Sequence, residues 1–257
     1  YWPGGTTGLE EALLREADTS IVYGSRDVVS LARTSAPLNA RLVIHGPRLS
    51  LGLVLGQNLD LDQIDAIAAD AAGAVATFDQ QGCVSPHAIF VLGPMAAAHD
   101  LATGLARALH QLEHRLPRGR MTPGEAVAML DARARAEFQA IAGRNIVLYS
   151  GREAPYTVVL DADEGFEASC LNRFITVRPL AAVERLTELL RPLADVLQSI
   201  ALAGFTEEET IRLAPVLGGL GISRITSFRA LPWPPPAWHH DGSEPLRELI
   251  RWIDLEI

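Results

Sequence analysis

The sequence predicts an α/β fold built around a largely parallel sheet. Segments in which apolar residues recur at helical spacing alternate with short apolar runs that are typical of strands. Thr122 with Glu125, and Thr206 with Glu209, have the spacing of a capping box and mark the starts of two helices. Strands that alternate with helices favour a parallel sheet with helices covering its faces.

The first part of the chain alternates strand-like and helix-like segments and ends in a long helix. In that helix, apolar residues recur at helical spacing from Leu61 to Phe78. In chain order we expect a helix at Leu9–Ala17, a strand at Thr19–Tyr23, a helix at Arg26–Thr34, strands at Arg41–Ile44 and Leu51–Leu55, and a helix at Asp62–Phe78.

The remainder continues the alternation and closes in an irregular tail. Pro123 stands at the first position of a helix that Gly143 closes. The tail from Leu231 is rich in Pro and Trp, which predicts a loop that wraps over a neighbouring surface. The other expected elements are a strand at Ala88–Leu92, a helix at Ala96–Leu116, strands at Asn145–Tyr149, Tyr156–Leu160 and Arg173–Val177, and a helix at Ile211–Leu217.

Cys83 lies in the connection between a predicted helix and a predicted strand. Gln, Gly, Ser, Pro and His surround it between Gln80 and His87, so its local sequence is polar. A thiol in such a turn can face a cleft, and nucleophilic reactivity follows the thiolate fraction and access. The alternative is an inert buried cysteine, which the polar surroundings disfavour.

Composition limits the classes of function. The 257 residues, 48% of them hydrophobic, suffice for a sizeable core, and a net charge of -9 argues against a nucleic-acid partner. Apolar runs are too short and interrupted for a transmembrane span. The two cysteines, Cys83 and Cys170, form no disulfide framework, so we expect a reducing, cytoplasmic location.

The segment Gln80–Val91 resembles the catalytic-cysteine segment of the aldehyde dehydrogenase superfamily, and more narrowly the long-chain fatty acyl-CoA reductases, the reductase component of bacterial bioluminescence. Further segments resemble the narrower family in the same order. They are Tyr1–Gly5 with Ile21–Ser25, then Ile44–Ser50, and finally Ala237–Gly242 with Leu249–Trp252.

This resemblance implies an aldehyde-dehydrogenase-like fold, with a three-layer αβα catalytic domain and the C-terminal part of a Rossmann-like cofactor domain. Residues 1–44 would belong to the cofactor domain, residues 45–228 to the catalytic domain, and residues 229–257 to a wrapping tail. Family members are nearly twice as long, and Tyr1 falls within what resembles the last third of the cofactor domain, so we expect the N-terminal half, which builds most of that domain, to be missing before Tyr1.

The resemblance further implies reduction of a fatty acyl thioester to an aldehyde through an acyl-cysteine on Cys83. His45 falls where aldehyde dehydrogenases carry a water-activating glutamate, and a histidine there can act as an acid–base group instead. A structural role for His45 remains the alternative, and His87 ranks second as the partner of Cys83. The rival functions are an acyl-transfer subunit without reductase activity, an oxidising aldehyde dehydrogenase, and an inactive scaffold, which would require an inaccessible Cys83.

The expected cofactor is NADPH. Gly24 and Ser25 end a strand and open a helix, a place where backbone N–H groups can meet a pyrophosphate, and the resemblance assigns them to the cofactor phosphate. Phe174 matches the superfamily phenylalanine at the nicotinamide ribose, but Asn172 stands in place of the accompanying glutamate. Cys170 is expected to be a packing residue.

Expected partners are a fatty acyl-CoA or an acyl-protein thioester, with a homo-oligomer or an acyl-donating protein also possible. The run His239-His240-Asp241 contains common metal ligands. Neighbouring side chains on an extended segment point apart, and further ligands at suitable spacing are missing from the sequence. We therefore expect no metal site.

Overall fold

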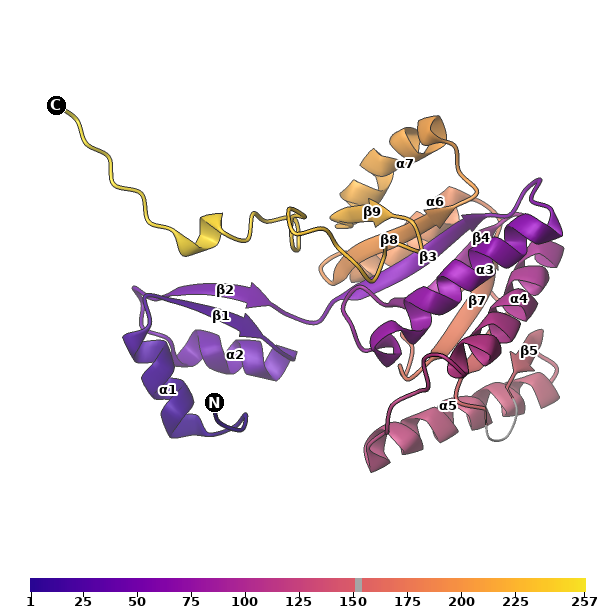
Figure 1. Cartoon of the computed structure of the whole chain (residues 1–257), viewed down its shortest axis with the longest axis horizontal. Helices are drawn as coiled ribbons and strands as arrows, with labels where there is room; N and C mark the ends of the chain where they lie inside the picture. Colours follow the sequence, from indigo (N-terminus) through magenta and orange to yellow (C-terminus); the bar gives the residue numbers. More distant parts are fainter. Residues whose placement is uncertain (151–153) are drawn as a thin grey trace. The chain divides into compact units, whose positions relative to one another are not determined.

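The computed structural model describes residues 1–150 and 154–257. The chain forms two compact units, which are treated separately below (Figure 1). The first contains Tyr1–Arg48 together with Ala237–Ile257, and the second contains Leu49–Pro236. The sequence predicts a catalytic domain that starts at residue 45. In the structure, His45 belongs to the first unit instead.

The first unit is a small two-stranded parallel sheet with two helices. Strand β1 pairs with β2 in a register that places Tyr23 beside His45. The apolar face of α2 packs on β1, and Ser25 caps the amino end of this helix. The elements are α1 (Thr7–Glu16), β1 (Thr19–Tyr23), α2 (Arg26–Ser35) and β2 (Arg41–His45).

The C-terminal tail belongs to this first unit. The Arg41 guanidinium donates hydrogen bonds to the carbonyls of Glu248 and Ile250, at 2.9 and 3.0 Å. A tight turn precedes this anchor, in which the Gly242 amide donates to the His239 carbonyl at 3.1 Å. The tail contains one short 3₁₀ helix, η3 (Arg247–Leu249), and is otherwise irregular, as expected.

The second unit is built on a seven-stranded sheet with the order β5-β6-β7-β4-β3-β8-β9. All neighbouring strands are parallel except β5 and β6. Its strands are β3 (Leu49–Leu55), β4 (Pro86–Leu92), β5 (Ile146–Tyr149), β6 (Thr157–Asp161), β7 (Phe174–Leu180), β8 (Leu197–Ala203) and β9 (Arg224–Thr226).

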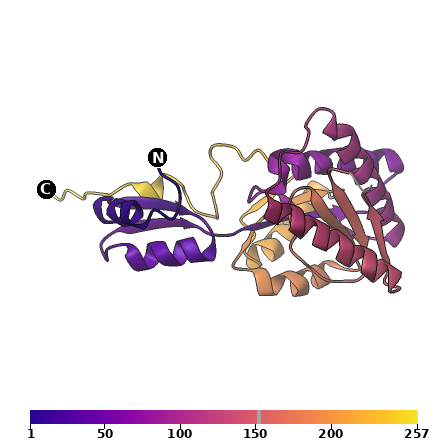
Figure 2. The same ribbon diagram turned by 90° about the horizontal axis from the view of Figure 1, so that it is seen from below.

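Helices cover both faces of this sheet, which gives the expected three-layer arrangement (Figures 1 and 2). Helices α3 (Leu61–Ala76) and α4 (Met95–Glu113) pack on one face, and α6 (Val183–Leu190) and α7 (Glu207–Gly219) on the other. The alternation of a strand explains the two cores: on β3, Leu51 and Leu53 enter one core and Val54 enters the other.

Helix α5 (Pro123–Ile141) adds a third, smaller core beside the edge strand β5. It presents Met129, Ala132 and Ala136 to Ile146, Val159 and Phe174. Across the described residues, no helix has both the length and the apolar character needed to cross a membrane.

The expected α/β fold class is confirmed, with local differences. The helix expected to reach Phe78 ends at Ala76, and a 3₁₀ turn, η1 (Thr77–Gln80), follows. The sequence prediction also omitted α6, β8 and β9. Because β8 is buried on both faces, its apolar run lacks the alternation that identifies a half-exposed strand.

Candidate functional site

Cys83 lies on the turn between η1 and β4, and its side chain is exposed. The backbone beneath it is firmly held. The Ser50 hydroxyl donates to the Cys83 carbonyl at 2.7 Å, and the Ser85 amide donates to the Gly82 carbonyl at 2.9 Å. Because the residues from Val84 to Val91 are buried, the turn presents an accessible thiol on a rigid base. An inactive scaffold would require an inaccessible thiol, which is not what the described structure has.

The backbone leading to this turn adopts the left-handed conformation at three successive residues, Phe78, Asp79 and Gln80, with φ of 57°, 49° and 65°. Such conformations are unfavourable for residues other than glycine and persist where the surroundings determine them. Two hydrogen bonds do so here. The buried side-chain amide of Gln80 donates through Nε2 to the Pro86 carbonyl at 2.8 Å, and the backbone amide of Asn172 donates to the Asp79 carbonyl at 3.0 Å.

Arg173 anchors the same backbone through its side chain, which is only 2% exposed. Its Nε and second terminal nitrogen both lie 2.7 Å from the Asp79 carboxylate. Its other terminal nitrogen donates to Glu113 at 2.8 Å and to the Leu116 carbonyl at 2.9 Å. The Gly119 amide completes the set by donating to Asp79 at 2.9 Å. One buried guanidinium thus fixes the chain four residues before Cys83.

Asn172 supports the cysteine turn from the loop before β7. It is 2% exposed, and its side-chain oxygen accepts from the Gln81 amide at 3.3 Å. The same Gln81 nitrogen lies 2.9 Å from the Glu125 carboxylate, whose pKa is lowered chiefly by the hydrogen bond from the Thr122 backbone. In this chain Asn172 therefore holds the loop that leads to Cys83 through its hydrogen bonds with Gln81 and Asp79.

His87 is buried in β4 and is 9% exposed. Burial lowers the pKa of its imidazole from 6.5 to about 4. Its Nδ1 has no hydrogen-bond partner among the described residues. A ring that is uncharged and enclosed at neutral pH is poorly placed to exchange protons with a solvent-exposed thiol. The ranking of His87 below His45 as the partner of Cys83 stays a prediction.

His45, in the first unit, is the last residue of β2 and lies within a stack of aromatic rings. The centroid of its ring is 4.6 Å from that of Tyr23 and 4.1 Å from that of His240. Trp238 continues the stack at 4.8 Å from His240. The rings leave 13% of the His45 side chain exposed.

Asp241 binds the edge of the His45 ring. Its Oδ2 lies 2.8 Å from His45 Nδ1, and its Oδ1 lies 3.0 Å from Arg48 Nε. The Asp241 side chain is 8% exposed. The pKa of the neighbouring His240 is lowered, chiefly by burial, although the Asp241 charge opposes the effect.

The nitrogens of His45 and His240 and the carboxylate of Asp241 lie within 4.8 Å of one another, which raises the question of a metal site. The two rings are stacked with 12° between their planes, so their nitrogen lone pairs lie in nearly parallel planes and do not converge on one ion. Arg48 also occupies the carboxylate. The arrangement is that of a hydrogen-bonded stack, and the expected absence of a metal stays a prediction.

Gly24 and Ser25 join β1 to α2 as expected. The Ser25 hydroxyl accepts from the Val28 amide at 3.4 Å, and the Gly24 amide donates to the His45 carbonyl at 3.2 Å. A Cβ at position 24 would lie 2.6 Å from Val28, so glycine is required by local packing. The amino end of α2 offers backbone donors of the kind that bind phosphate, and the assignment of Gly24 and Ser25 to a cofactor phosphate stays a prediction.

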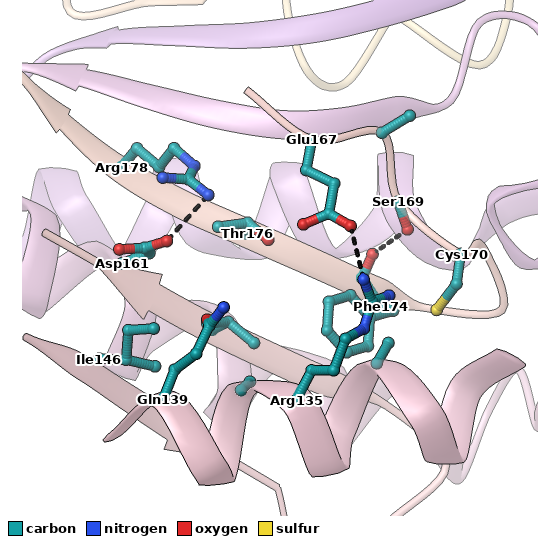
Figure 3. Close-up of a pocket in the computed structure, with 14 residues that line it drawn as sticks. Arg135, Gln139, Ile146, Asp161, Glu167, Ser169, Cys170, Phe174, Thr176 and Arg178 are labelled. Atoms are coloured by element: carbon teal, nitrogen blue, oxygen red, sulfur yellow. Dashed lines mark hydrogen bonds and ion pairs between the residues drawn. The ribbon is translucent and has the colours of Figure 1, made fainter. Parts of the chain in front are cut away.

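Phe174 begins β7 and faces α5, where it is 8% exposed and lines a small cavity of about 130 Å³ (Figure 3). Cys170 lies on the wall of this cavity, and burial raises the pKa of its thiol. Two ion pairs, Arg178–Asp161 and Arg135–Glu167, border it at 2.9 and 3.1 Å. The expected contact of Phe174 with a cofactor stays a prediction.

A family model described as acyl-CoA reductase (LuxC) matches residues 1–252 of the chain. The chain belongs to the LuxC family of acyl-CoA reductases. It is 22% identical over 264 residues to the long-chain acyl-protein thioester reductase of Vibrio harveyi, and 24% identical over 273 residues to that of Photorhabdus luminescens. Each match covers 100% of this chain and 51% and 50% of the relative, so the chain spans about half the length of these LuxC-family proteins.

Solved structures share the fold at low sequence identity. The NADP-dependent glyceraldehyde-3-phosphate dehydrogenase of Bacillus halodurans has a TM-score of 0.72 at 14% identity, with 97% of this chain and 54% of that chain covered. An oxidoreductase of Marinobacter aquaeolei has a TM-score of 0.70 at 17% identity, with 93% and 51% covered. These likenesses confirm the expected aldehyde-dehydrogenase-like fold for a LuxC-family chain.

Proposed function

We propose that the chain carries the nucleophile of a fatty acyl thioester reductase, and that Cys83 is this nucleophile. The observation that supports the proposal most directly is an exposed thiol on a turn whose backbone is fixed by buried side chains. Such placement suits a nucleophile, because the thiol is accessible while its carbonyl and the preceding residues cannot drift. Membership of the acyl-CoA reductase family gives the reaction class.

In the proposed reaction, the Cys83 thiol loses its proton, and the sulfur attacks the carbonyl carbon of the acyl thioester. The bond from that carbon to the donor sulfur breaks, and the departing thiolate takes up a proton. A nicotinamide cofactor, proposed to be NADPH, supplies a hydride when it is bound. Addition of hydride and a proton to the acyl-cysteine gives a hemithioacetal, which releases the aldehyde and restores the thiol.

The substrate is proposed to be a long-chain acyl group carried on CoA or on a protein. The relatives from Vibrio harveyi and Photorhabdus luminescens are named acyl-protein thioester reductases, which favours a protein donor as a second source. Gly24 and Ser25 are proposed to hold the cofactor phosphate at the amino end of α2.

His45 is proposed as the acid–base group that accepts the thiol proton or protonates the departing thiolate. The support is chemical: its Nδ1 is engaged by a carboxylate, which leaves Nε2 as the nitrogen for proton transfer. A glutamate at this position would instead activate water and divert the acyl group to the free acid. Retention of the acyl-cysteine is what a reductase requires.

The test is acylation of the full-length protein with hexadecanoyl-CoA in the absence of cofactor, followed by intact-mass and peptide mass spectrometry. We expect one acyl group on Cys83, none on the Cys83→Ala variant, and full labelling of Cys170→Ser, because the Cys170 thiol is half-buried with a raised pKa. Subsequent NADPH should release aldehyde. Labelling of Cys170 would contradict the assignment, and transfer of the acyl group to a partner without reduction would favour the acyl-transfer function.

The His45→Glu and His45→Gln variants separate reductase from oxidising dehydrogenase. The first should raise the proportion of free acid over aldehyde, since a carboxylate can activate water. The second should slow formation or reduction of the acyl-cysteine by about 10²- to 10⁴-fold if the imidazole transfers protons. If both variants behave like the wild type, His45 is structural.

A further inference from the structure

The C-terminal tail brings a carboxylate to the one ring nitrogen of His45 that faces it. An ionised carboxylate only accepts hydrogen bonds, so a separation of 2.8 Å between Asp241 Oδ2 and His45 Nδ1 places a proton on Nδ1. The partner of one imidazole nitrogen determines which tautomer is present. In this arrangement the lone pair of the neutral ring is on Nε2.

Asp241 itself has little freedom to move. Its other oxygen lies 3.0 Å from Arg48 Nε, and its backbone is left-handed with φ of 54° at the tip of the tail turn. The turn is closed by a hydrogen bond from the Ser243 amide to the His240 carbonyl at 3.0 Å. The carboxylate is therefore fixed by the tail on one side and by Arg48, at the end of the first segment of the unit, on the other.

The ring stack removes the remaining freedom of His45. Tyr23 and His240 both stack against it, with 18° and 12° between the ring planes, and their own centroids lie 6.0 Å apart. The titratable and charged groups facing His45 are thus Tyr23 from β1, Arg48 after β2, and His240 and Asp241 from the tail. Burial lowers the pKa of His240, which favours its uncharged form, and the charges of Arg48 and Asp241 oppose each other.

We propose that Asp241 is a positioning residue for His45: it fixes the plane and the tautomer of the imidazole, so the C-terminal tail supplies half of a His–Asp pair. This inference rests on the proposed acid–base function of His45. Asp241 is not proposed to touch the substrate or to exchange protons. It acts by keeping the lone pair of the imidazole on Nε2, where it can take up a proton, and by holding the ring in one plane.

The experiment compares four variants of the full-length protein: Asp241→Asn, His45→Gln, the double variant, and Glu244→Gln. Asparagine has the shape of aspartate and tolerates the left-handed backbone, but its amide can donate to Nδ1 and select the wrong tautomer. Glu244 lies in the same tail, is exposed and pairs with Arg247 three residues further on, so it controls for loss of a tail carboxylate. Single-turnover acylation by hexadecanoyl-CoA and aldehyde release with NADPH are measured across pH.

We expect Asp241→Asn to lower kcat by at least about tenfold, and by no more than His45→Gln, with KM nearly unchanged. The double variant should be no slower than His45→Gln alone, because the two residues act as one unit. Glu244→Gln should match the wild type. A wild-type rate in Asp241→Asn, a change confined to KM, or an additive loss in the double variant would overturn the inference while leaving the proposed function of His45 intact.

If His45→Gln leaves every rate unchanged, the proposed function of His45 fails, and the inference fails with it. A second measurement reads the tautomer of His45 in the wild-type protein itself. In protein labelled with ¹⁵N at histidine, and with the His45 signals assigned from the His45→Gln spectrum, long-range ¹H–¹⁵N correlations should report a proton on Nδ1 of the neutral ring. A proton on Nε2 would contradict the positioning role.

Discussion

His87 makes the stability of the second unit depend on pH in a way that can be calculated. Its pKa is about 4 in the folded chain and 6.5 when the ring is exposed, because burial disfavours the charged imidazole. Between these values the unfolded chain binds a proton that the folded chain does not. Stability therefore falls as pH drops from 6.5 to 4, and the contribution is fully present above pH 6.5.

The magnitude follows from the difference of 2.5 pKa units, worked from the values 6.5 and about 4. At 1.36 kcal/mol per unit, it corresponds to about 3 kcal/mol of unfolding free energy. We propose urea denaturation of the wild type and of His87→Gln at several pH values from 7 to 4, followed by circular dichroism. The difference in unfolding free energy between the two proteins should change by about that amount.

His99→Gln is the matched control, because the His99 ring is exposed and its replacement leaves the buried His87 imidazole in place. A constant difference between wild type and His87→Gln across this range would refute the reasoning, since it would mean that His87 takes up its proton in the folded chain. In that case His87 would regain its place as an alternative partner for Cys83.

Two further predictions concern the cysteine turn and the cofactor. Arg173→Met removes the guanidinium from its two carboxylate partners, Asp79 and Glu113, and should lower the unfolding free energy measured in urea by about 3 kcal/mol and slow Cys83 acylation. A variant as stable and as reactive as the wild type would show that the network does not fix the turn. Gly24→Val places side-chain atoms against Val28, and should weaken NADPH binding in a fluorescence titration while Cys83 acylation continues. Unchanged binding would remove Gly24 from the proposed phosphate site.

Much of the fold could be predicted because its signals are local. Capping boxes at Thr122 and Thr206 mark α5 and α7, and both are present with reciprocal hydrogen bonds. Helix α6 carries no side-chain cap at its amino end, and β8 is an apolar run without alternation. Elements of this kind are recognised by what they pack against, and a single sequence does not give that information.

The site divides in the same way. Cys83 was recognisable from its polar turn and its family resemblance, and the structure places it on an exposed turn. The contacts that hold the two candidate groups are separated by 94 residues between Asp79 and Arg173 and by 196 residues between His45 and Asp241. The sequence offered Asp241 as part of a possible metal motif, and the left-handed turn that directs it to His45 carries no signal readable from spacing alone.

The Cys83 turn lies at the amino ends of the parallel strands, and this location decides which helix dipoles act on it. Helix α3 starts beyond the carboxyl end of β3 and runs back, so its negative end, not its positive end, leads into the turn. Helix α5 begins near Gln81, but its first turn is closed by Thr122 and the carboxylate of Glu125. The Cys83 turn is therefore approached by the negative end of α3, and the amino end of α5 beside Gln81 already carries the Glu125 carboxylate.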